Sequence, residues 1–351
     1  MHCPTLVELP LPPTGKTGWP WTEESPRLPD TGPDSLAWPR SSIVMPSFNQ
    51  GQFLEETLRS VLLQVYPDVE YIVIDGGSRD DSVEIIRRYE PWLAYWVSEP
   101  DRGQPHAINK GLERTTGEII AYINSDDYYL PGAFSTVAQE YVREPFDLIA
   151  GICRYVDAYG NKLLEAKGGP HNLLDILDLA RYERSYLTQP EVFWTRHVLN
   201  TCGLLREDLL RCFDYEYWLR AIASGFSIRY VDEVIACFRR HVQQKTRDPA
   251  GGLAETMPLV HKYIETHANL RSQERRRISR GLHWGQAKVH YLRSRQAADE
   301  GRTKTAIVAC LRGVGANFPF SLRERLLLSC FKRIMLSLII GRNIRQRVWV
   351  L

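Results

Sequence analysis

From Ser42 to about residue 150, two kinds of apolar pattern alternate along the chain. Short, unbroken apolar runs predict buried strands, and apolar residues three or four positions apart predict amphipathic helices. The predicted strands span residues 42–45, 69–75, 94–99 and 118–124. The predicted helices span residues 51–67, 78–90 and 104–115, and a segment that Pro131 opens at its first position. Buried strands that alternate with helices predict a parallel sheet with helices on both faces.

Beyond residue 150 this alternation weakens. A hairpin is predicted to turn near Gly160 and Asn161, and residues 211–225 predict an amphipathic helix that its final glycine closes. Residues 226–241 predict one strand or a pair of strands, and helices follow from about residue 253. The fold class expected from these elements is α/β, followed by a helical C-terminal extension.

The first 40 residues hold nine of the 21 prolines. Proline fixes φ and lacks a backbone donor, so we expect this segment to be an extended leader outside the core. We therefore predict three regions: a Pro-rich leader over 1–40, an α/β domain over 41–250 and a basic helical region over 251–351.

The net charge of +2 hides a strong asymmetry. Residues 271–351 carry 18 Lys and Arg against four Asp and Glu, a net of +14, and the remainder has a net of −12. Such a basic segment suits an anionic partner, and a peripheral contact with a membrane surface is the interpretation we favour. Its longest apolar run, residues 334–340, is too short to span a bilayer, so an interfacial helix and a packed helical subdomain both stay open. No nucleic-acid-binding motif accompanies the charge, and we predict no nucleic-acid partner.

The cysteines indicate a reducing compartment. There are seven, they are scattered, and none forms a CxxC pair, which argues against a disulfide framework or a zinc site. The N-terminal sequence has no basic patch before an apolar run, so no secretory signal is predicted. We expect a cytoplasmic protein, located at the inner face of the cell membrane if the basic region binds lipid.

Three of the predicted strands end in polar clusters: PSFN, DGGSRDD and NSDD. The carboxyl ends of parallel strands meet at one edge of a sheet, where ligands bind, so these clusters are expected to converge. Adjacent carboxylates such as Asp126 and Asp127 repel each other unless they share a cation, and oxygen ligands suit Mg²⁺ or Mn²⁺. A solvated turn is the alternative for this pair. Ser78 and Asp81 have the spacing of a capping box for the helix that follows them.

Five ordered motifs carry a specific resemblance: IVMPSFNQGQFLEETLRSVLLQ, YIVIDGGSRDDS, SEPDRGQPHAINKGL, GEIIAYINSDDYYLPGA and FDYEYWLRA. In order and spacing, over residues 42–246, they resemble the family 2 glycosyltransferases of the GT-A fold. The resemblance implies a mixed, mostly parallel sheet and an inverting transfer of a sugar from a UDP-, dTDP- or GDP-sugar. It also implies that the acceptor is a hydroxyl group of a glycan or of a polyprenyl-linked glycan, with Mg²⁺ or Mn²⁺ as the cofactor.

The resemblance also assigns roles to residues. Those implied at the donor are Pro46, Ser47, Asn49, Asp75, Asp101, Gly103, Asn109 and Asp126. Those implied at the metal are Asp126, Asp127 and His241. The general base is Asp214, and the acceptor side comprises Gln189, Trp194 and Trp218. Each role has a structural alternative: the tryptophans can belong to the core, the histidine can be structural, and Asp214 can cap its helix.

The chain departs from the family pattern at three positions. Gly76 stands where a second acid is usual, Asn124 opens the metal motif, and Phe213 precedes the base. Glu216 is the other candidate base, but on a helix it points about 200° away from Asp214, so the two cannot share one role. Nucleotidyl transfer and an inactive, glycosyltransferase-like binding protein are the competing functions.

Overall fold

The computed structural model describes residues 3–181, 187–244, 248–266 and 270–315. The chain divides into two compact units. The first comprises Met1–His171 and Tyr186–His241, and the second comprises Asn172–Ser185 and Val242–Leu351. The predicted apolar run at residues 334–340 lies outside the described residues.

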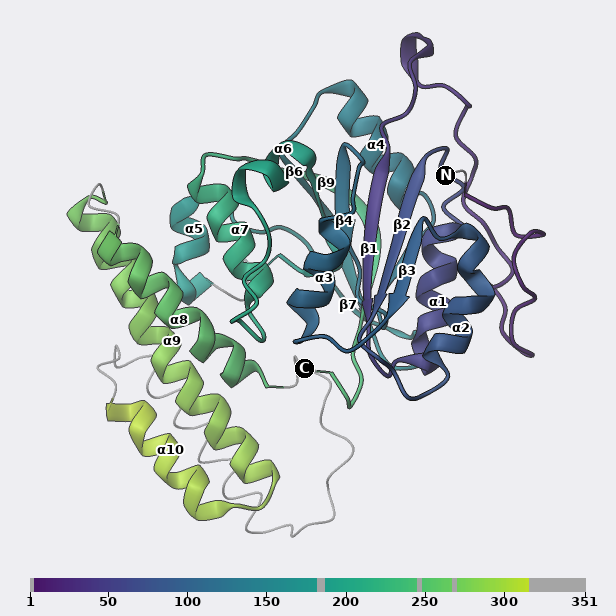
Figure 1. The fold of residues 1–351 in the computed structure, drawn as a ribbon. Helices are drawn as coiled ribbons and strands as arrows, with labels where there is room; N and C mark the ends of the chain where they lie inside the picture. Colours follow the sequence, from purple (N-terminus) through teal and green to yellow (C-terminus); the bar gives the residue numbers. More distant parts are fainter. Residues whose placement is uncertain (1–2, 182–186, 245–247, 267–269, 316–351) are drawn as a thin grey trace. The chain divides into compact units, whose positions relative to one another are not determined.

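The first unit is built on a nine-stranded mixed sheet (Figure 1). Its strands are β1 (Ser41–Ser47), β2 (Val69–Asp75), β3 (Tyr95–Ser98), β4 (Ile119–Tyr122), β5 (Tyr128–Tyr129), β6 (Leu148–Val156), β7 (Lys162–Ala166), β8 (Val192–Thr195) and β9 (Ile228–Arg239). Their order is β3-β2-β1-β4-β8-β6-β9-β5, with β7 beside β6. The four strands at the β3 end are parallel, and β8 pairs antiparallel with both β4 and β6.

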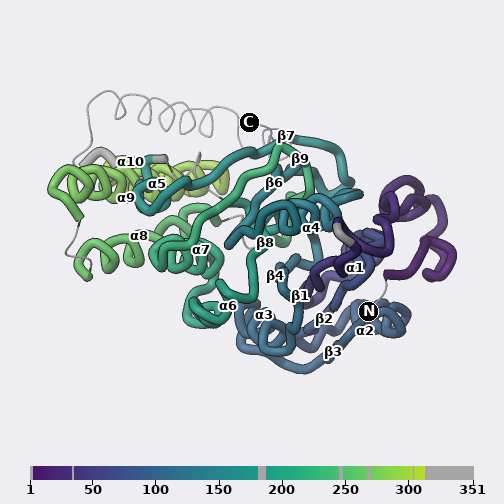
Figure 2. The backbone as a smooth tube through the Cα atoms, turned by 90° about the horizontal axis from the view of Figure 1, so that it is seen from above, coloured from purple at the N-terminus to yellow at the C-terminus, as the bar shows by residue number. Residues whose placement is uncertain are grey.

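Helices cover both faces of the parallel strands, because alternate residues of a strand point to opposite sides. The helices of this unit are α1 (Gly51–Leu62), α2 (Ser82–Tyr89), α3 (Gln104–Leu112), α4 (Ala133–Arg143), α6 (Arg196–Cys202) and α7 (Phe213–Ala223). Val73 of β2 belongs to the same buried cluster as Leu54 and Leu58 of α1, whereas Ile72 packs with Ala107 of α3. Seen from above, α1 and α3 accordingly lie on opposite sides of β1 and β2 (Figure 2). The expected α/β fold class with a mixed sheet is confirmed.

Two predicted helix starts are corrected. The second helix begins at Ser82 with Asp81 as its N-cap, and Ser78 is not part of a capping box because its hydroxyl donates to Asp75 instead. The helix after the acidic cluster begins at Ala133, and its N-cap is Gly132, with a φ of 80°, so Pro131 lies before the helix.

The Pro-rich leader differs from the expectation that it lies outside the core. Cys3, Leu9, Leu28 and Trp38 are buried members of the main hydrophobic cluster. Proline prevents regular hydrogen-bonded elements, but it does not prevent an extended chain from burying apolar side chains on a neighbouring surface.

Arg59 of α1 anchors this leader. Its guanidinium is fully buried and donates to the carbonyl oxygens of Pro20 at 3.0 Å, Pro10 at 2.8 Å and Trp21 at 2.9 Å. The guanidinium thus supplies hydrogen bonds to leader carbonyl oxygens that are not hydrogen-bonded in a strand or a helix.

The second unit is helical in its described residues. Its helices are α5 (Leu173–Leu177), α8 (Pro249–Thr266), α9 (Ser272–Asp299) and α10 (Thr303–Gly315). Arg277 of α9 forms ion pairs with Asp175 at 3.1 Å and Asp178 at 2.8 Å, which join α9 to the α5 segment. A helical C-terminal part is therefore confirmed, and none of the described helices has the length and apolarity needed to cross a membrane.

Candidate functional site

The polar strand ends converge as predicted. Ser47 of β1 is in register with Asp75 of β2, which is in register with Ser98 of β3. Tyr122, the last residue of β4, is in register with Val44, so the NSDD cluster begins at the same edge. The carboxyl ends of four parallel strands therefore form one polar edge.

Asp75 organises this edge from inside. Its carboxylate is fully buried and accepts hydrogen bonds from the backbone N–H groups of Gly77 and Ser78 and from the hydroxyls of Ser78 and Ser98, at 2.5–3.1 Å. The same Ser78 hydroxyl accepts the backbone N–H of Asn49 at 2.7 Å. The carboxylate thus fixes the turn that follows β2, and the role of Asp75 at the donor stays a prediction.

The surface of the edge is formed by neighbouring residues. Asp101 accepts the backbone N–H of Gly103 at 2.7 Å, and a Cβ placed on Gly76 would lie 2.4 Å from Asp101 Oδ2 and 3.3 Å from the Phe48 ring. Gly76 therefore leaves room for the Asp101 carboxylate. The aromatic ring of Phe48 is 57% exposed beside it. Asn49 is exposed with a φ of 52°, and Gly103, with a φ of 119°, is the N-cap of α3.

Two of the residues predicted at the donor lie in β1 and are less accessible. Pro46 and Ser47 are both buried at the end of the strand, and the Ser47 hydroxyl has no hydrogen-bond partner within the described residues. Sequence reasoning named these two residues and missed Phe48, although an aromatic residue between them and Asn49 is a visible signal.

The acidic turn separates its two carboxylates. Asp127 is 1% exposed, and its oxygens accept the backbone N–H of Arg239 at 2.8 Å and the side-chain amide of Asn124 at 3.3 Å. Burial, and after it the charge of Asp126, raises the pKa of Asp127 well above its usual range. Both Asp127 oxygens thus serve the turn, and which of Asp126 and Asp127 contacts a metal directly stays open.

Asp126 faces a different partner. Its Oδ2 lies 2.8 Å from Nε2 of His241, the residue that follows β9 by two positions. The His241 ring packs against Phe53 at 4.7 Å between centroids, which fixes its orientation. The structure thus brings together Asp126 and His241, which lie 115 residues apart in the sequence.

Arg239 supports this pair, and sequence reasoning did not identify it. The side chain is 2% exposed; its Nε donates to the carbonyl oxygen of Asp126 at 2.9 Å, and it forms an ion pair with Glu56 at 2.9 Å. The guanidinium also lies over the rings of Phe53 and Tyr128. Arg239 therefore holds the acidic turn through both its backbone and its side chain.

The predicted base is buried at the start of α7. Asp214 is the second residue of α7 and is 7% exposed. Burial, followed by the charges of Asp214 and Asp127, raises the pKa of the Tyr122 phenol well above its usual range. The ring of Phe213 lies 6.5 Å from that of Tyr122. The charges of two carboxylates, one on α7 and one in the acidic turn, thus act on the same phenol.

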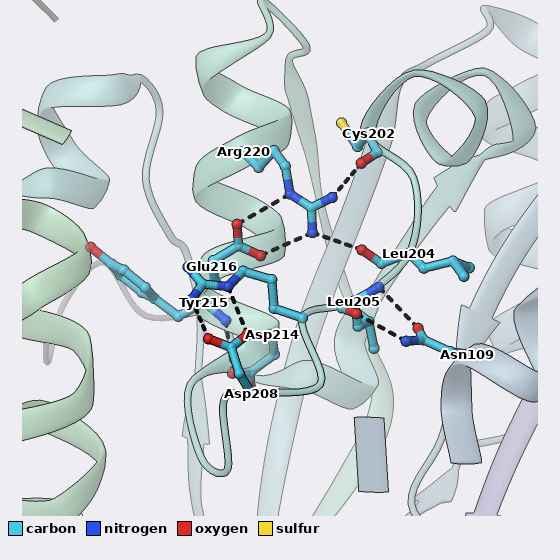
Figure 3. Close-up of polar contacts among 10 residues, drawn as sticks. Asn109, Cys202, Leu204, Leu205, Asp208, Asp214, Tyr215, Glu216 and Arg220 are labelled. Carbon is cyan, nitrogen blue, oxygen red and sulfur yellow. Dashed lines mark hydrogen bonds and ion pairs between the residues drawn. The ribbon is translucent and has the colours of Figure 1, made fainter. Parts of the chain in front are cut away.

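Glu216 is committed elsewhere. Its carboxylate forms an ion pair with Arg220 at 2.9 Å, and Arg220 also donates to the carbonyl oxygens of Leu204 and Cys202 (Figure 3). The N-cap of α7 is Cys212, so Asp214 is not the cap residue either.

The residues predicted on the acceptor side are internal. Trp194 is fully buried and Trp218 is 2% exposed, and their rings pack edge to face at 5.5 Å. Gln189 is buried; it donates to the carbonyl oxygen of Tyr122 and accepts from the amide of Asn124. The tryptophans thus fill the core and Gln189 supports the acidic turn, and a contact of these three residues with an acceptor stays a prediction.

Asn109, which is predicted at the donor, makes a structural contact in this fold. It is 4% exposed, and its amide makes paired hydrogen bonds of 2.9 Å with the backbone N–H and carbonyl of Leu205.

Within the described residues, no group of three or more His, Cys, Asp or Glu side chains is arranged to hold a metal ion.

Comparisons with known proteins agree with this architecture. Residues 42–213 match the family model "Glycosyl transferase family 2". An uncharacterized glycosyltransferase of Mycobacterium tuberculosis is 41% identical over 92 residues, which are 26% of this chain and 35% of that protein. The GalNAc(5)-diNAcBac-PP-undecaprenol beta-1,3-glucosyltransferase of Campylobacter jejuni is 30% identical over 37% of this chain and 40% of its own length. The matches to these two relatives thus cover less than half of each relative.

Two solved structures share the fold. One is Staphylococcus aureus TarS 1–349 in complex with UDP-GlcNAc, with a TM-score of 0.56 and 17% identity over 85% of this chain and 89% of that one. The other is the mannosyltransferase PcManGT from Pyrobaculum calidifontis in complex with GDP-Man and Mn²⁺, with a TM-score of 0.54 and 18% identity over 87% of this chain and 90% of that one.

Proposed function

Because the chain belongs to glycosyl transferase family 2, we propose that it moves a sugar from a nucleotide-sugar donor to a hydroxyl group of an acceptor. One observation supports the proposal: Asp126 is paired with His241 at 2.8 Å, while a separate carboxylate, Asp214 at the start of α7, acts on the Tyr122 phenol together with Asp127, the neighbour of Asp126. Inverting transfer needs these two sites, one for the departing diphosphate and one for the incoming hydroxyl.

The nucleoside is proposed to bind at the ends of β1 and β2. The exposed ring of Phe48 offers a stacking surface, and the Asp101 carboxylate beside Gly76 offers an acceptor for base or ribose donors. The N-terminus of α3 at Gly103 is electropositive, which favours the negative charge of the diphosphate. The solved neighbours that hold UDP-GlcNAc and GDP-Man support a nucleotide-sugar donor, whether a UDP-, dTDP- or GDP-sugar.

Asp126 and His241 are the residues that we propose hold Mg²⁺ or Mn²⁺. Their nearest atoms lie 2.8 Å apart, close to the separation of about 3 Å between adjacent ligands of an octahedral ion bound at 2.1 Å. Two protein ligands suit an ion that takes its remaining ligands from water and phosphate. When bound, the ion would neutralise the charge of the leaving diphosphate. Asp127 and Arg239 fix the turn that presents Asp126.

Asp214 is the proposed general base. The first turn of a helix is electropositive and therefore suits a carboxylate. In that position Asp214 would take the proton of the acceptor hydroxyl as the hydroxyl attacks the anomeric carbon on the face opposite the diphosphate. The alternative base, Glu216, is already paired with Arg220, which supports the choice of Asp214.

A lipid-linked acceptor fits the charge of the chain. The Campylobacter relative is named for an undecaprenol-linked substrate, and residues 271–351 carry a net charge of +14. We therefore propose a polyprenyl-linked or growing glycan as acceptor, handled by a cytoplasmic protein that contacts the inner face of the membrane peripherally.

The test is a donor panel with purified protein. Binding of UDP-, dTDP- and GDP-sugars is measured by calorimetry with and without Mn²⁺, and slow donor hydrolysis is followed by release of the nucleotide. One donor class is expected to bind more tightly with Mn²⁺, and H241A and D126N are expected to remove the Mn²⁺ effect. D214N should keep donor binding and abolish transfer. If no nucleotide sugar binds under either condition, the proposal is wrong, and release of pyrophosphate from nucleoside triphosphates would favour nucleotidyl transfer instead.

A further inference from the structure

The segment that leads into the proposed base is clamped from two sides (Figure 3). Residues 203–212 join α6 to α7. On one side the Asn109 amide holds the backbone of Leu205 through two hydrogen bonds of 2.9 Å. On the other side Arg220 donates to the carbonyl oxygens of Cys202 and Leu204 while it is paired with Glu216.

A third contact strengthens the Asn109 side. Glu207 accepts the Asn109 side-chain N–H at 3.3 Å and the Arg102 guanidinium at 2.6 Å. Arg102 precedes the Gly103 cap of α3. The loop is therefore tied to the start of α3 as well as to its middle.

Helix α3 thus contacts both halves of the proposed site. Near its N-terminus, Gln104 donates to Asn124 of the acidic turn at 2.5 Å, and in its middle Asn109 binds the loop before α7. A side-chain amide that pairs with both the N–H and the C=O of one residue fixes that residue in position and direction, because each bond is directional. The nearly complete burial of Asn109 removes water as a substitute partner.

We propose that Asn109 is a positioning residue for Asp214: by holding Leu205, it sets where the loop delivers the start of α7 relative to the acidic turn. This inference rests on the proposed function. Loss of the amide leaves the Leu205 backbone groups without partners, so the loop shifts to satisfy them. A displacement of about 1 Å at a catalytic group can lower the rate about 100-fold.

The experiment compares Asn109→Asp and Asn109→Leu with Lys110→Met in the full chain. Asp has the shape of Asn but replaces the N–H donor to Leu205 by an oxygen, so this variant tests the clamp where Asn109→Leu fails to fold. Lys110 is the adjacent residue of α3 and forms an ion pair with Glu99, which makes it the matched control. For each protein we would measure donor affinity by calorimetry, kcat and KM of transfer, and the pH dependence of kcat.

The Asn109 variants are expected to lower kcat of transfer about 10- to 100-fold, with donor affinity changed less than threefold and the acid limb of the pH profile displaced. Lys110→Met should behave as wild type. Arg220→Lys, which keeps the charge beside Glu216 but loses the fork to Cys202 and Leu204, should reproduce the effect on kcat. A uniform loss of donor binding and transfer with an unchanged pH profile would show a purely structural role and overturn the inference. A wild type that transfers no sugar would overturn the proposed function, and the inference with it.

Discussion

Arg239→Met is expected to destabilise the first unit and to weaken the response to Mn²⁺. The substitution removes a buried cation that joins Glu56 to the backbone of the acidic turn. Methionine keeps an apolar side chain that can pack between Phe53 and Tyr128. A cavity should therefore contribute little to the loss of stability.

The magnitude follows from what is left behind. The Glu56 side chain is 14% exposed and loses its partner at 2.9 Å. Breaking a buried ion pair by removing one member costs about 3–5 kcal/mol. Arg239→Met also loses hydrogen bonds to the carbonyl oxygens of Asp126 and Ala158. Each is worth about 1 kcal/mol, and this contribution is already partly contained in the cost of breaking the ion pair. We expect a total loss of about 3–5 kcal/mol, a large part of the about 5–15 kcal/mol available to a typical protein.

The assay is urea unfolding followed by tryptophan fluorescence, for wild type, Arg239→Met, Glu56→Gln and the double variant. Because the double variant leaves no stranded carboxylate, it should be more stable than Arg239→Met by about 1–3 kcal/mol. Donor titrations with and without Mn²⁺ should show a smaller Mn²⁺ effect for Arg239→Met, since the turn that carries Asp126 loses its support. The reasoning would be refuted if Arg239→Met lost less than about 1 kcal/mol of unfolding free energy. It would also be refuted if the double variant were less stable than both single variants.

Three further outcomes are expected. Arg59→Met should release the leader and cost about 3 kcal/mol or more, seen as faster proteolytic cleavage within the first 40 residues; an unchanged cleavage rate would contradict the anchoring role. Burial raises the pKa of Glu191 well above its usual range, so this carboxyl stabilises the fold at low pH and less so as pH rises; Glu191→Gln should therefore have a higher Tm than wild type at pH 8 and an equal one near pH 4, and the same difference at both would argue against a titrating carboxyl. Gly76→Ala should displace the Asp101 carboxylate and raise the KM for the donor with little change in Tm, and an unchanged KM would remove Asp101 from the donor site.

The elements of the α/β part were predictable because each obeys a local rule. Residues 69–75 form β2 with the predicted bounds, and the hairpin turns at Gly160, whose φ of 86° suits glycine. The leader was not predictable in this way. Its prolines correctly exclude regular elements, but its burial depends on Arg59, whose partners lie 38 to 49 residues away along the chain.

The site was predictable as a location and less so as a set of roles. Strand order and spacing placed Asp75, Asp126 and Asp127 at one edge, and they are there. Whether a carboxylate is available to a ligand depends on how many of its oxygens are already used, and that is a property of the folded backbone. Asp75 accepts four hydrogen bonds from its own turn and from Ser98, so the most prominent acid of the sequence is internal.

Buried cations explain what the motifs alone leave out. A sequence pattern marks Asp126 and His241 because acids and histidines bind metals, but arginine is usually a surface residue and attracts no attention. In this fold Arg239 and Arg59 are both almost completely buried, and each donates to backbone carbonyls that no strand or helix satisfies. The irregular segments next to the sheet, the acidic turn and the leader, are therefore held by charged side chains rather than by regular hydrogen bonding. Lysine at either position should therefore not restore the stability that the methionine variants lose. A single ammonium cannot reproduce a planar guanidinium fork that reaches several carbonyl oxygens at once.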